Sequence, residues 1–278
     1  MSDLSSWLKA DILSLGMAAD EARRALRGAA TTYLRVHIVS GKDAVTAEIP
    51  HGAAEIRVPA LPESLEDAIA LVAALRGRVG ARRVAAYSMA DLEQRASDGW
   101  GSLESILQRL VAAGLSDVSD LPVDRVTSPA RALTMLAAAG ARPRRLTVQS
   151  PLGDARLELL EMVRACRRAV ATPLFVAPLP KEAPVDKPTT GYDDLRMVAL
   201  TRLLLAEEPH AVESFVEVDW TSYGPKLAQV ALTFGADHLD AVAATTDPSM
   251  GPRRGTVADV ERNIRAAGFE PRELQLSA

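Results

Sequence analysis

Cysteine is nearly absent from this sequence, because its 278 residues include only one, Cys166. A solitary thiol can form no disulfide within the chain, so the fold depends on its own core. No segment approaches the roughly 20 consecutive apolar residues that a transmembrane helix requires. The N-terminal stretch has charged residues in each apolar run and lacks the apolar core of a signal peptide. These absences predict a cytoplasmic protein.

Aromatic residues and positive charge are also scarce. Aromatic residues make up 4% of the chain against 48% hydrophobic residues, which favours buried parallel strands and helices over an aromatic-rich β sandwich. The formal net charge of −4 provides no broad positive field for a phosphate backbone, so we expect neither a nucleic-acid nor a membrane partner. Short basic pairs at residues 82–83, 144–145 and 253–254 fall at expected turns, and we interpret them as solvated surface.

Strand-like apolar runs alternate with helical patterns along most of the chain. The expected strands cover residues 33–40, 53–60, 82–88, 116–123, 144–150, 173–180, 211–220 and 238–245. The clearest helix follows Ser64, a predicted N-cap with Asp67 three residues on, and ends at Gly80. Helices between successive strands imply parallel pairing with right-handed crossovers. Roughly eight such units predict an α/β fold, a (β/α)₈ TIM-type barrel that is whole or slightly open. We assign residues 1–28 to an N-terminal helical extension and residues 29–278 to the barrel.

One stretch, "GPKLAQVALTFGADHLDAV" at residues 224–242, contains a helix, its stop signal and the last strand. Gly235 is the expected stop. Asp237 and Asp240 are interpreted as turn and cap groups at the amino-terminal face of the barrel, and His238 as a surface ion-pair partner.

The same region carries a family likeness. Residues 193–210, 220–242 and 256–271 resemble the radical-SAM enzymes of the futalosine route to menaquinone, namely aminofutalosine synthase and dehypoxanthine futalosine cyclase, with deazaflavin synthase subunits as relatives. The order Gly, Lys, Gln and Phe-Gly-Ala-Asp in "GPKLAQVALTFGADHLD" is its most specific part. A fainter likeness runs upstream in the same order, so the resemblance covers nearly the whole chain. It implies a radical-SAM-like barrel.

The sequence departs from this family where the family's chemistry resides. In the family, a CxxxCxxC motif after the first strand holds three irons of a [4Fe–4S] cluster, and S-adenosylmethionine chelates the fourth. The corresponding residues 40–52 contain no cysteine, and Lys, Asp and Glu cannot replace thiolates around iron and sulfide. The family's glycine-rich turn after the second strand reads "PALPES", and its His and Glu after the last strand are missing from residues 245–255. We therefore expect no [4Fe–4S] cluster, and the resemblance gives little support for binding of S-adenosylmethionine.

Polar residues near the ends of the expected strands are the candidates for ligand binding, because barrel enzymes place their working side chains there. These candidates are His37, Ser40, Gln149, Ser150, Asp219, Trp220, Ser222, Tyr223 and Lys226. Stacking and hydrogen bonds from them could hold a purine- or aryl-containing ligand. The equally weighted alternative is a barrel mouth that the same side chains fill. No metal site is expected, because the histidines lack ligand spacing.

Three functions remain open on this sequence. The retained scaffold motifs beside the missing cysteines favour a cluster-less, catalytically inactive relative that binds a pathway metabolite or serves as partner subunit of an authentic family enzyme. The alternative is a non-radical barrel enzyme that acts on a futalosine-like or other small metabolite. The third is a structural subunit that self-associates through an apolar face of the N-terminal helix. The residues of that face are Trp7, Leu8, Ile12 and Leu13.

Overall fold

Eight parallel strands form the ring at the centre of the protein. The computed structural model describes residues 4–39, 46, 48–149, 155–170, 172–180, 189–245 and 256–274. The ring strands are β1 (Ala30–Ile38), β2 (Glu55–Val58), β3 (Arg83–Ser88), β4 (Asp117–Pro122), β6 (Leu146–Val148), β7 (Leu174–Pro180), β8 (Ser214–Asp219) and β9 (His238–Ala243). They follow one another around the ring in the order of the sequence.

The ring is closed by pairing between its first and last strands. Thr32 of β1 pairs with His238 of β9, and Tyr33 pairs with Leu239. The predicted (β/α)₈ barrel is thus confirmed in its closed form, and the slightly open form that the sequence allowed is wrong. In such a barrel the carboxyl ends of all the strands meet at one end of the ring.

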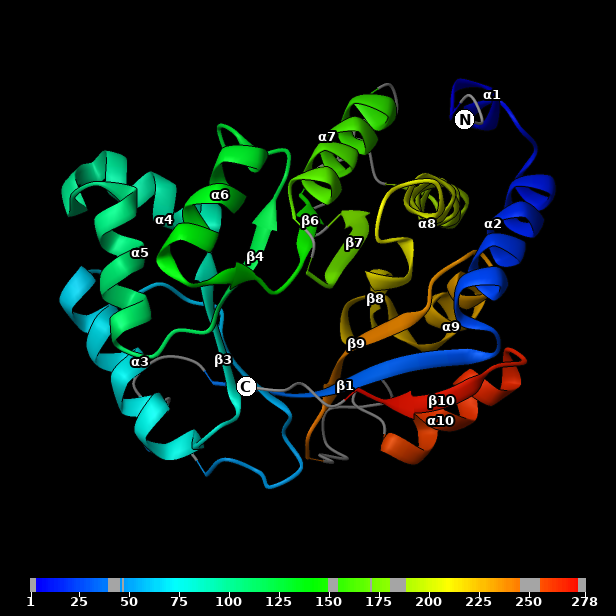
Figure 1. Ribbon diagram of the computed structural model, residues 1–278. Coiled ribbons are helices and arrows are strands. Elements are labelled where there is room, and N and C mark those ends of the chain that lie inside the picture. Colours follow the sequence, from blue (N-terminus) through cyan, green and yellow to red (C-terminus); the bar gives the residue numbers. More distant parts are fainter. Residues whose placement is uncertain are drawn as a thin grey trace.

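Helices surround the ring on its outside (Figure 1). They are α1 (Leu4–Leu8), α2 (Ile12–Arg27), α3 (Leu65–Val79), α4 (Met89–Arg95), α5 (Leu103–Ala112), α6 (Pro129–Ala139), α7 (Arg156–Ala169), α8 (Gly191–Ala206), α9 (Trp220–Leu232) and α10 (Val257–Ala266), with short helical turns at Ala96–Trp100 and Ala211–Glu213. None of the helices in the described part of the chain has both the length and the apolar character needed to cross a membrane.

Local signals set several element ends as predicted. The Ser64 hydroxyl accepts a hydrogen bond of 3.1 Å from the Asp67 backbone N–H and so caps α3, which ends before Gly80. Gly235 follows α9 with a φ of +100°, and a Cβ built there would lie 2.7 Å from the Cβ of Arg202. Both the backbone conformation and the close approach therefore require glycine at this stop.

Two short strands were missed by the sequence analysis. β5 (Arg142–Pro143) pairs with β4, and β10 (Glu270–Glu273) pairs with the first half of β1. β10 consists of the charged sequence EPRE, which has no apolar alternation, so only its pairing with β1 makes it a strand. The expected strand 144–150 is shorter than predicted, because β6 covers only Leu146–Val148.

The N-terminal helices pack against the barrel rather than presenting the expected apolar face. Helix α2 lies beside α8, as Figure 1 shows. Trp7, Leu8 and Ile12 are partly buried against the hydrophobic core, so these three form less of an exposed surface than expected. Leu13 is 70% exposed and does fit the expectation.

The carboxyl-terminal part of α2 is hydrogen-bonded to the amino-terminal end of the barrel. Arg27 Nε donates to Asp237 Oδ2 at 2.8 Å, and Arg23 Nε donates to the Ala236 carbonyl at 2.9 Å. The second carboxylate oxygen of Asp237 accepts from the Val216 backbone N–H at 2.8 Å. Asp237 is therefore a structural turn residue, as the sequence indicates.

Candidate functional site

A network of three arginines and three carboxylates fills the middle of the barrel. Its members come from β2, β8, β9 and the segment before β6, and all six are buried. They are Glu55, Arg57, Arg144, Arg145, Glu217 and Asp240. The formal charges of the six cancel, which is the condition under which ions are tolerated away from water.

Asp240 is the centre of this network. Arg57 binds it through two bonds of 2.6 and 2.7 Å, while Arg144 and Arg145 donate single bonds of 2.9 and 2.8 Å. Burial opposes ionisation of Asp240, but the charges of these three arginines outweigh it and hold the pKa of the carboxyl well below its usual range. The interpretation of Asp240 as a turn group is therefore wrong.

The other two carboxylates accept further hydrogen bonds from the same arginines. Glu55 accepts from Arg57 Nε and, at 2.9 Å, from Arg144 Nε. Glu217 accepts from Arg144 Nη1 at 3.2 Å and from Arg145 Nη1 at 3.0 Å. Arg144 and Arg145 thus belong to the interior, and their interpretation as a solvated pair is wrong. Arg83 is also buried, so that interpretation fails for the pair at 82–83 as well.

Aromatic rings close the space at the amino-terminal side of this network. Phe175 and Phe215 stack with their ring centroids 4.6 Å apart, and His238 lies edge-on to Phe175 at 4.9 Å. The His238 ring nitrogen Nδ1 lies 2.8 Å from the Thr32 hydroxyl. Burial, and after it the charge of Arg144, lowers the pKa of His238 to about 3, so the imidazole is neutral. The interpretation of His238 as a surface ion-pair partner is wrong.

Glu217, His238 and Asp240 bring three possible metal-ligating atoms within 4.8 Å of one another. Both carboxylates, however, already neutralise the network arginines, and Arg144 and Arg145 bind both of them. A divalent cation here would add two positive charges to a buried group that is already neutral. The surroundings of these three ligands therefore disfavour a metal ion.

A cavity of about 460 Å³ opens above the network at the carboxyl ends of β7 and β8. We call it the carboxyl-end cavity. Arg145 and Glu217 of the network reach its inner wall. Its remaining lining residues are Ala177, Leu179, Pro180, Thr189, Asp219, Ser222 and Tyr223. Apolar β7 residues thus face a polar wall that combines one guanidinium, two carboxylates and three hydroxyl groups.

The polar groups of this wall are held by bonds to the scaffold. One Asp219 oxygen accepts from the backbone N–H groups of Thr221 and Ser222 at 3.0 and 2.9 Å, and so caps α9. The other oxygen lies 3.8 Å from Arg145 Nη1. The Tyr223 hydroxyl donates to the Pro180 carbonyl, and burial raises the pKa of this phenol, so its proton stays in place. The cavity is therefore preorganised, with the Ser222 side chain exposed beside it.

The structure gathers only part of the predicted site. Asp219, Ser222 and Tyr223 line the carboxyl-end cavity, whereas Trp220 is 2% exposed and belongs to the hydrophobic core. Lys226 is exposed on α9 and is not among the lining residues.

Two further candidates lie on other strands. Gln149 follows β6, and its backbone N–H donates to the Asp124 carboxylate at 2.9 Å. His37 shares the outer side of β1 with Tyr33, whose hydroxyl donates to Glu261 of α10. Burial lowers the pKa of His37. Ser40 and Ser150 lie outside the described residues.

Sequence reasoning missed Arg145 and Glu217, although a signal for Glu217 existed. Phe215, Glu217 and Asp219 alternate along β8, so a charged residue shares the inward face with an aromatic ring. A charge at such a position indicates either a buried ion pair or a ligand site.

The cysteine content does not fit a [4Fe–4S] cluster. Cys166, the single cysteine of the sequence, lies inside α7, is fully buried and packs in the hydrophobic core. Burial raises the pKa of this thiol to about 12. Iron–sulfur clusters are held by several thiolates, and one buried neutral thiol cannot replace them.

Comparison with known proteins places this chain near two kinds of enzyme, although no family model matches it. Over 90 residues it is 36% identical to aminodeoxyfutalosine synthase of Streptomyces coelicolor. Over 89 residues it is 34% identical to 5-amino-6-(D-ribitylamino)uracil–L-tyrosine 4-hydroxyphenyl transferase 2 of Methanosarcina barkeri. Each match covers 30% of this chain and 22% of the length of the relative. Over that part of the chain, these matches confirm the resemblance inferred from the sequence motifs.

Two solved structures share the fold over almost the whole chain. Methylornithine synthase matches with a TM-score of 0.67 at 12% identity, and the match covers 97% of this chain and 93% of that one. HydG, a maturase of the [FeFe]-hydrogenase, matches with a TM-score of 0.64 at 11% identity over 96% of this chain and 71% of its own. At such identities the likeness establishes the barrel fold alone.

Proposed function

We propose that this protein is a radical-SAM-like barrel that works without an iron–sulfur cluster and binds a small polar metabolite in its carboxyl-end cavity. The observation that carries the proposal is the pairing of a preorganised polar cavity with a chain whose single thiol is buried. A cavity of about 460 Å³ lies within the range of about 300–1,000 Å³ that is usual for small-molecule sites.

The lining residues define the class of ligand. Arg145 can bind an anionic or carbonyl oxygen, while the free side of Asp219 and the hydroxyl groups can bind donors and hydroxyls of the ligand. The apolar β7 wall suits a flat ring. Since one relative is named aminodeoxyfutalosine synthase, a futalosine-type nucleoside is the first ligand to test.

The hydrogen bonds of the cavity favour binding over acid–base catalysis. One Asp219 oxygen caps the start of α9 and the other is open to a ligand, but the Tyr223 proton is already donated to a backbone carbonyl. Acid–base catalysis needs a proton donor as well as a base at the reacting atom, and the phenol of this wall is not available as that donor. The non-radical enzyme of the sequence analysis therefore ranks second, and turnover of a futalosine-type nucleoside without a reductant would reverse that order.

Calorimetric titration with futalosine and with adenosine tests the proposal. We expect saturable binding, and we expect Ser222→Trp to abolish it because the new ring occupies the cavity. Val230→Trp provides the matched control, since Val230 is 43% exposed on the same helix and lies outside the cavity wall. Equal binding by both variants, or none by the unmodified protein, would contradict the proposal.

A role as partner subunit of an authentic menaquinone-pathway radical-SAM enzyme is compatible with the same site. The protein would then deliver the bound metabolite to that enzyme, or report to it that the metabolite is present. Co-purification of the two proteins with and without futalosine would test this extension separately from binding itself.

A further inference from the structure

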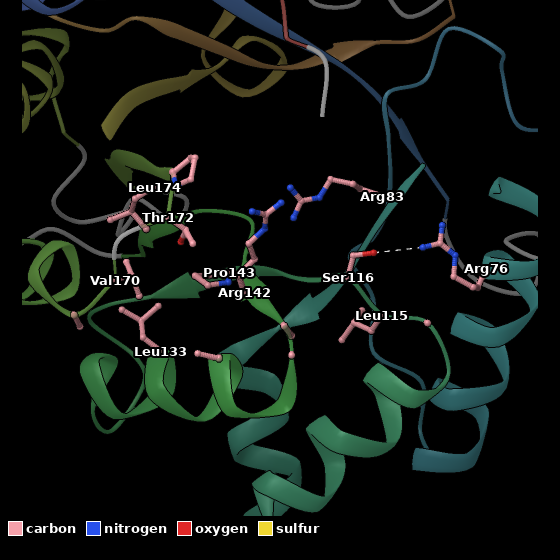
Figure 2. A pocket seen from close by; sticks show the side chains of 16 residues that line it. Arg76, Arg83, Leu115, Ser116, Leu133, Arg142, Pro143, Val170, Thr172 and Leu174 are labelled. Carbon is pink, nitrogen blue, oxygen red and sulfur yellow. Dashed lines mark hydrogen bonds between the residues drawn. The ribbon is translucent and has the colours of Figure 1, made fainter. Parts of the chain in front are cut away.

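A second and larger cavity lies at the opposite end of the barrel. It has a volume of about 820 Å³ and is formed where β3, β4, β5 and β7 begin, beside the loops that follow α5, α6 and α7. We call it the amino-end cavity (Figure 2). The amino-terminal end of a barrel usually serves stability, so an open cavity of this size is unexpected there.

Three arginines face this cavity, and one carboxylate neutralises only part of their charge. Figure 2 shows the guanidinium groups of Arg83 and Arg142 pointing toward one another. Both bind the buried carboxylate of Asp117, Arg83 Nε at 2.8 Å and Arg142 Nε at 3.2 Å. Among the described residues, neither terminal nitrogen of Arg142 has a protein acceptor, and its side chain is 39% exposed. These donors are therefore open to a ligand.

Arg76 adds a positive charge that no acidic side chain of the described chain neutralises. Its Nη2 donates to the Gly80 and Arg82 carbonyls, and its Nη1 makes a long bond of 3.5 Å to the Ser116 hydroxyl. Gly114 makes room for it, because a Cβ there would lie 2.4 Å from the Arg76 Cγ. Three guanidiniums against one carboxylate leave two positive charges around the cavity.

The rest of the wall is apolar. Aliphatic side chains from the loops, from α6 and from the start of β7 line it, including Leu115, Leu133, Val170 and Leu174. A cavity that combines uncompensated guanidiniums with an aliphatic wall matches a ligand with a negative group and an apolar body.

We propose that the amino-end cavity binds a small organic anion, with its carboxylate or phosphate held by Arg142 beside Arg83 and its apolar body against the aliphatic wall. The site is separate from the carboxyl-end cavity, and it does not depend on the function proposed for that cavity. Carboxylates and phosphates share the bidentate geometry that guanidinium groups recognise.

The fluorescent anion 8-anilinonaphthalene-1-sulfonate is the probe, since it joins a sulfonate to an aromatic body. We expect saturable binding that Arg142→Gln weakens about tenfold, the loss of one charge-assisted contact. Arg131→Gln is the matched control, because Arg131 is a 74% exposed arginine of α6 that does not line the cavity. The uncharged analogue N-phenyl-1-naphthylamine should bind more weakly and be insensitive to Arg142→Gln.

Two further variants distinguish binding in the amino-end cavity from binding elsewhere on the protein. Ala137→Phe, at an exposed position on the cavity wall, should block the probe without any change of charge. Ser222→Trp, which fills the opposite cavity, should leave probe affinity unchanged. Competition by benzoate but not by phenyl phosphate would identify the carboxylate as the natural group, and the reverse would identify the phosphate. Equal affinity in Arg142→Gln and Arg131→Gln, or loss of binding in Ser222→Trp, would overturn the proposal.

Discussion

The two ends of the barrel differ in how their buried charges are balanced. At the carboxyl end, Arg145 meets Glu217, Asp219 and Asp240, so the arginine that reaches the cavity is fully compensated. At the amino end, Arg83 and Arg142 share the single carboxylate of Asp117. A balanced cavity suits a polar ligand with both donors and acceptors, whereas an excess of guanidinium suits an anion.

The largest expected effect comes from breaking the balance inside the barrel. Asp240→Ala removes the carboxylate that binds Arg57, Arg144 and Arg145, and leaves buried positive charge uncompensated. We expect the free energy of unfolding in urea to fall by about 3–5 kcal/mol. Glu66→Ala is the control, since it breaks an exposed ion pair with Arg109 and should cost less than about 1 kcal/mol.

If Asp240→Ala fails to fold, Asp240→Asn tests the same point with the shape preserved. Equal stability of Asp240→Asn and the unmodified protein would show that the interior charge does not stabilise the fold. A loss larger than that of Glu66→Ala would support the network.

A substitution in the scaffold at the amino-terminal end of the barrel should lower the free energy of unfolding by less than Asp240→Ala does, but by a measurable amount. Gly235→Ala places a methyl group against the Arg202 side chain at a residue whose φ is +100°. We expect a loss of about 1–3 kcal/mol of unfolding free energy, from backbone strain together with the close contact. Gly77→Ala in α3 is the matched control, because nothing lies within 4 Å of its added Cβ, and it should leave stability unchanged or slightly raise it.

Acidification should increase the excess of positive charge around the amino-end cavity. Burial raises the pKa of Asp117 to about 6, although Arg83 opposes this shift, and Glu55 and Arg144 also act on it from the barrel interior. Below that pKa, Asp117 loses its charge and the arginines around the cavity lose their counter-ion. Affinity for the naphthalene sulfonate should therefore rise as the pH falls from 7 to 5, by up to about tenfold.

Asp117→Asn supplies the control for this titration. With no ionisable group at residue 117, affinity should be high and independent of pH over the same range. A pH dependence that survives in Asp117→Asn would assign the titration to another group.

The smallest expected effect is that of a thiol reagent on the native protein, because Cys166 should not react. Its thiol is buried and its pKa is raised to about 12, so almost no thiolate exists at pH 8. A thiol-specific disulfide reagent should leave the native protein unlabelled and label one thiol per chain after unfolding in urea. Rapid labelling of the native protein would show that α7 opens.

The order and type of most elements could be predicted because their signals are local. The Ser64 cap, the stop at Gly80 and the alternation of strands with helices each depend on a few neighbouring residues. The charged strand β10 could not be predicted, since it exists only through pairing with β1, which lies near the other end of the sequence.

The candidate site could be predicted only in part, because some of its residues follow from local sequence signals and others depend on contacts between distant strands. Asp219, Ser222 and Tyr223 follow directly from a strand end, and the structure gathers them at one cavity. The burial of Arg144 and Arg145, by contrast, depends on carboxylates at residues 55, 217 and 240, which only the closed ring brings together. The local sequence around a pair of arginines is the same whether the pair lies on the surface or in a buried network, so it could not predict this burial.

Anaerobic reconstitution of the purified protein with iron and sulfide, followed by assay of iron and acid-labile sulfide per chain, tests whether this barrel works without a cluster. We predict only background amounts of both, because one buried thiol cannot hold a cluster. Uptake of about four irons and four sulfides per chain, stable to gel filtration, would show that the barrel does hold a cluster.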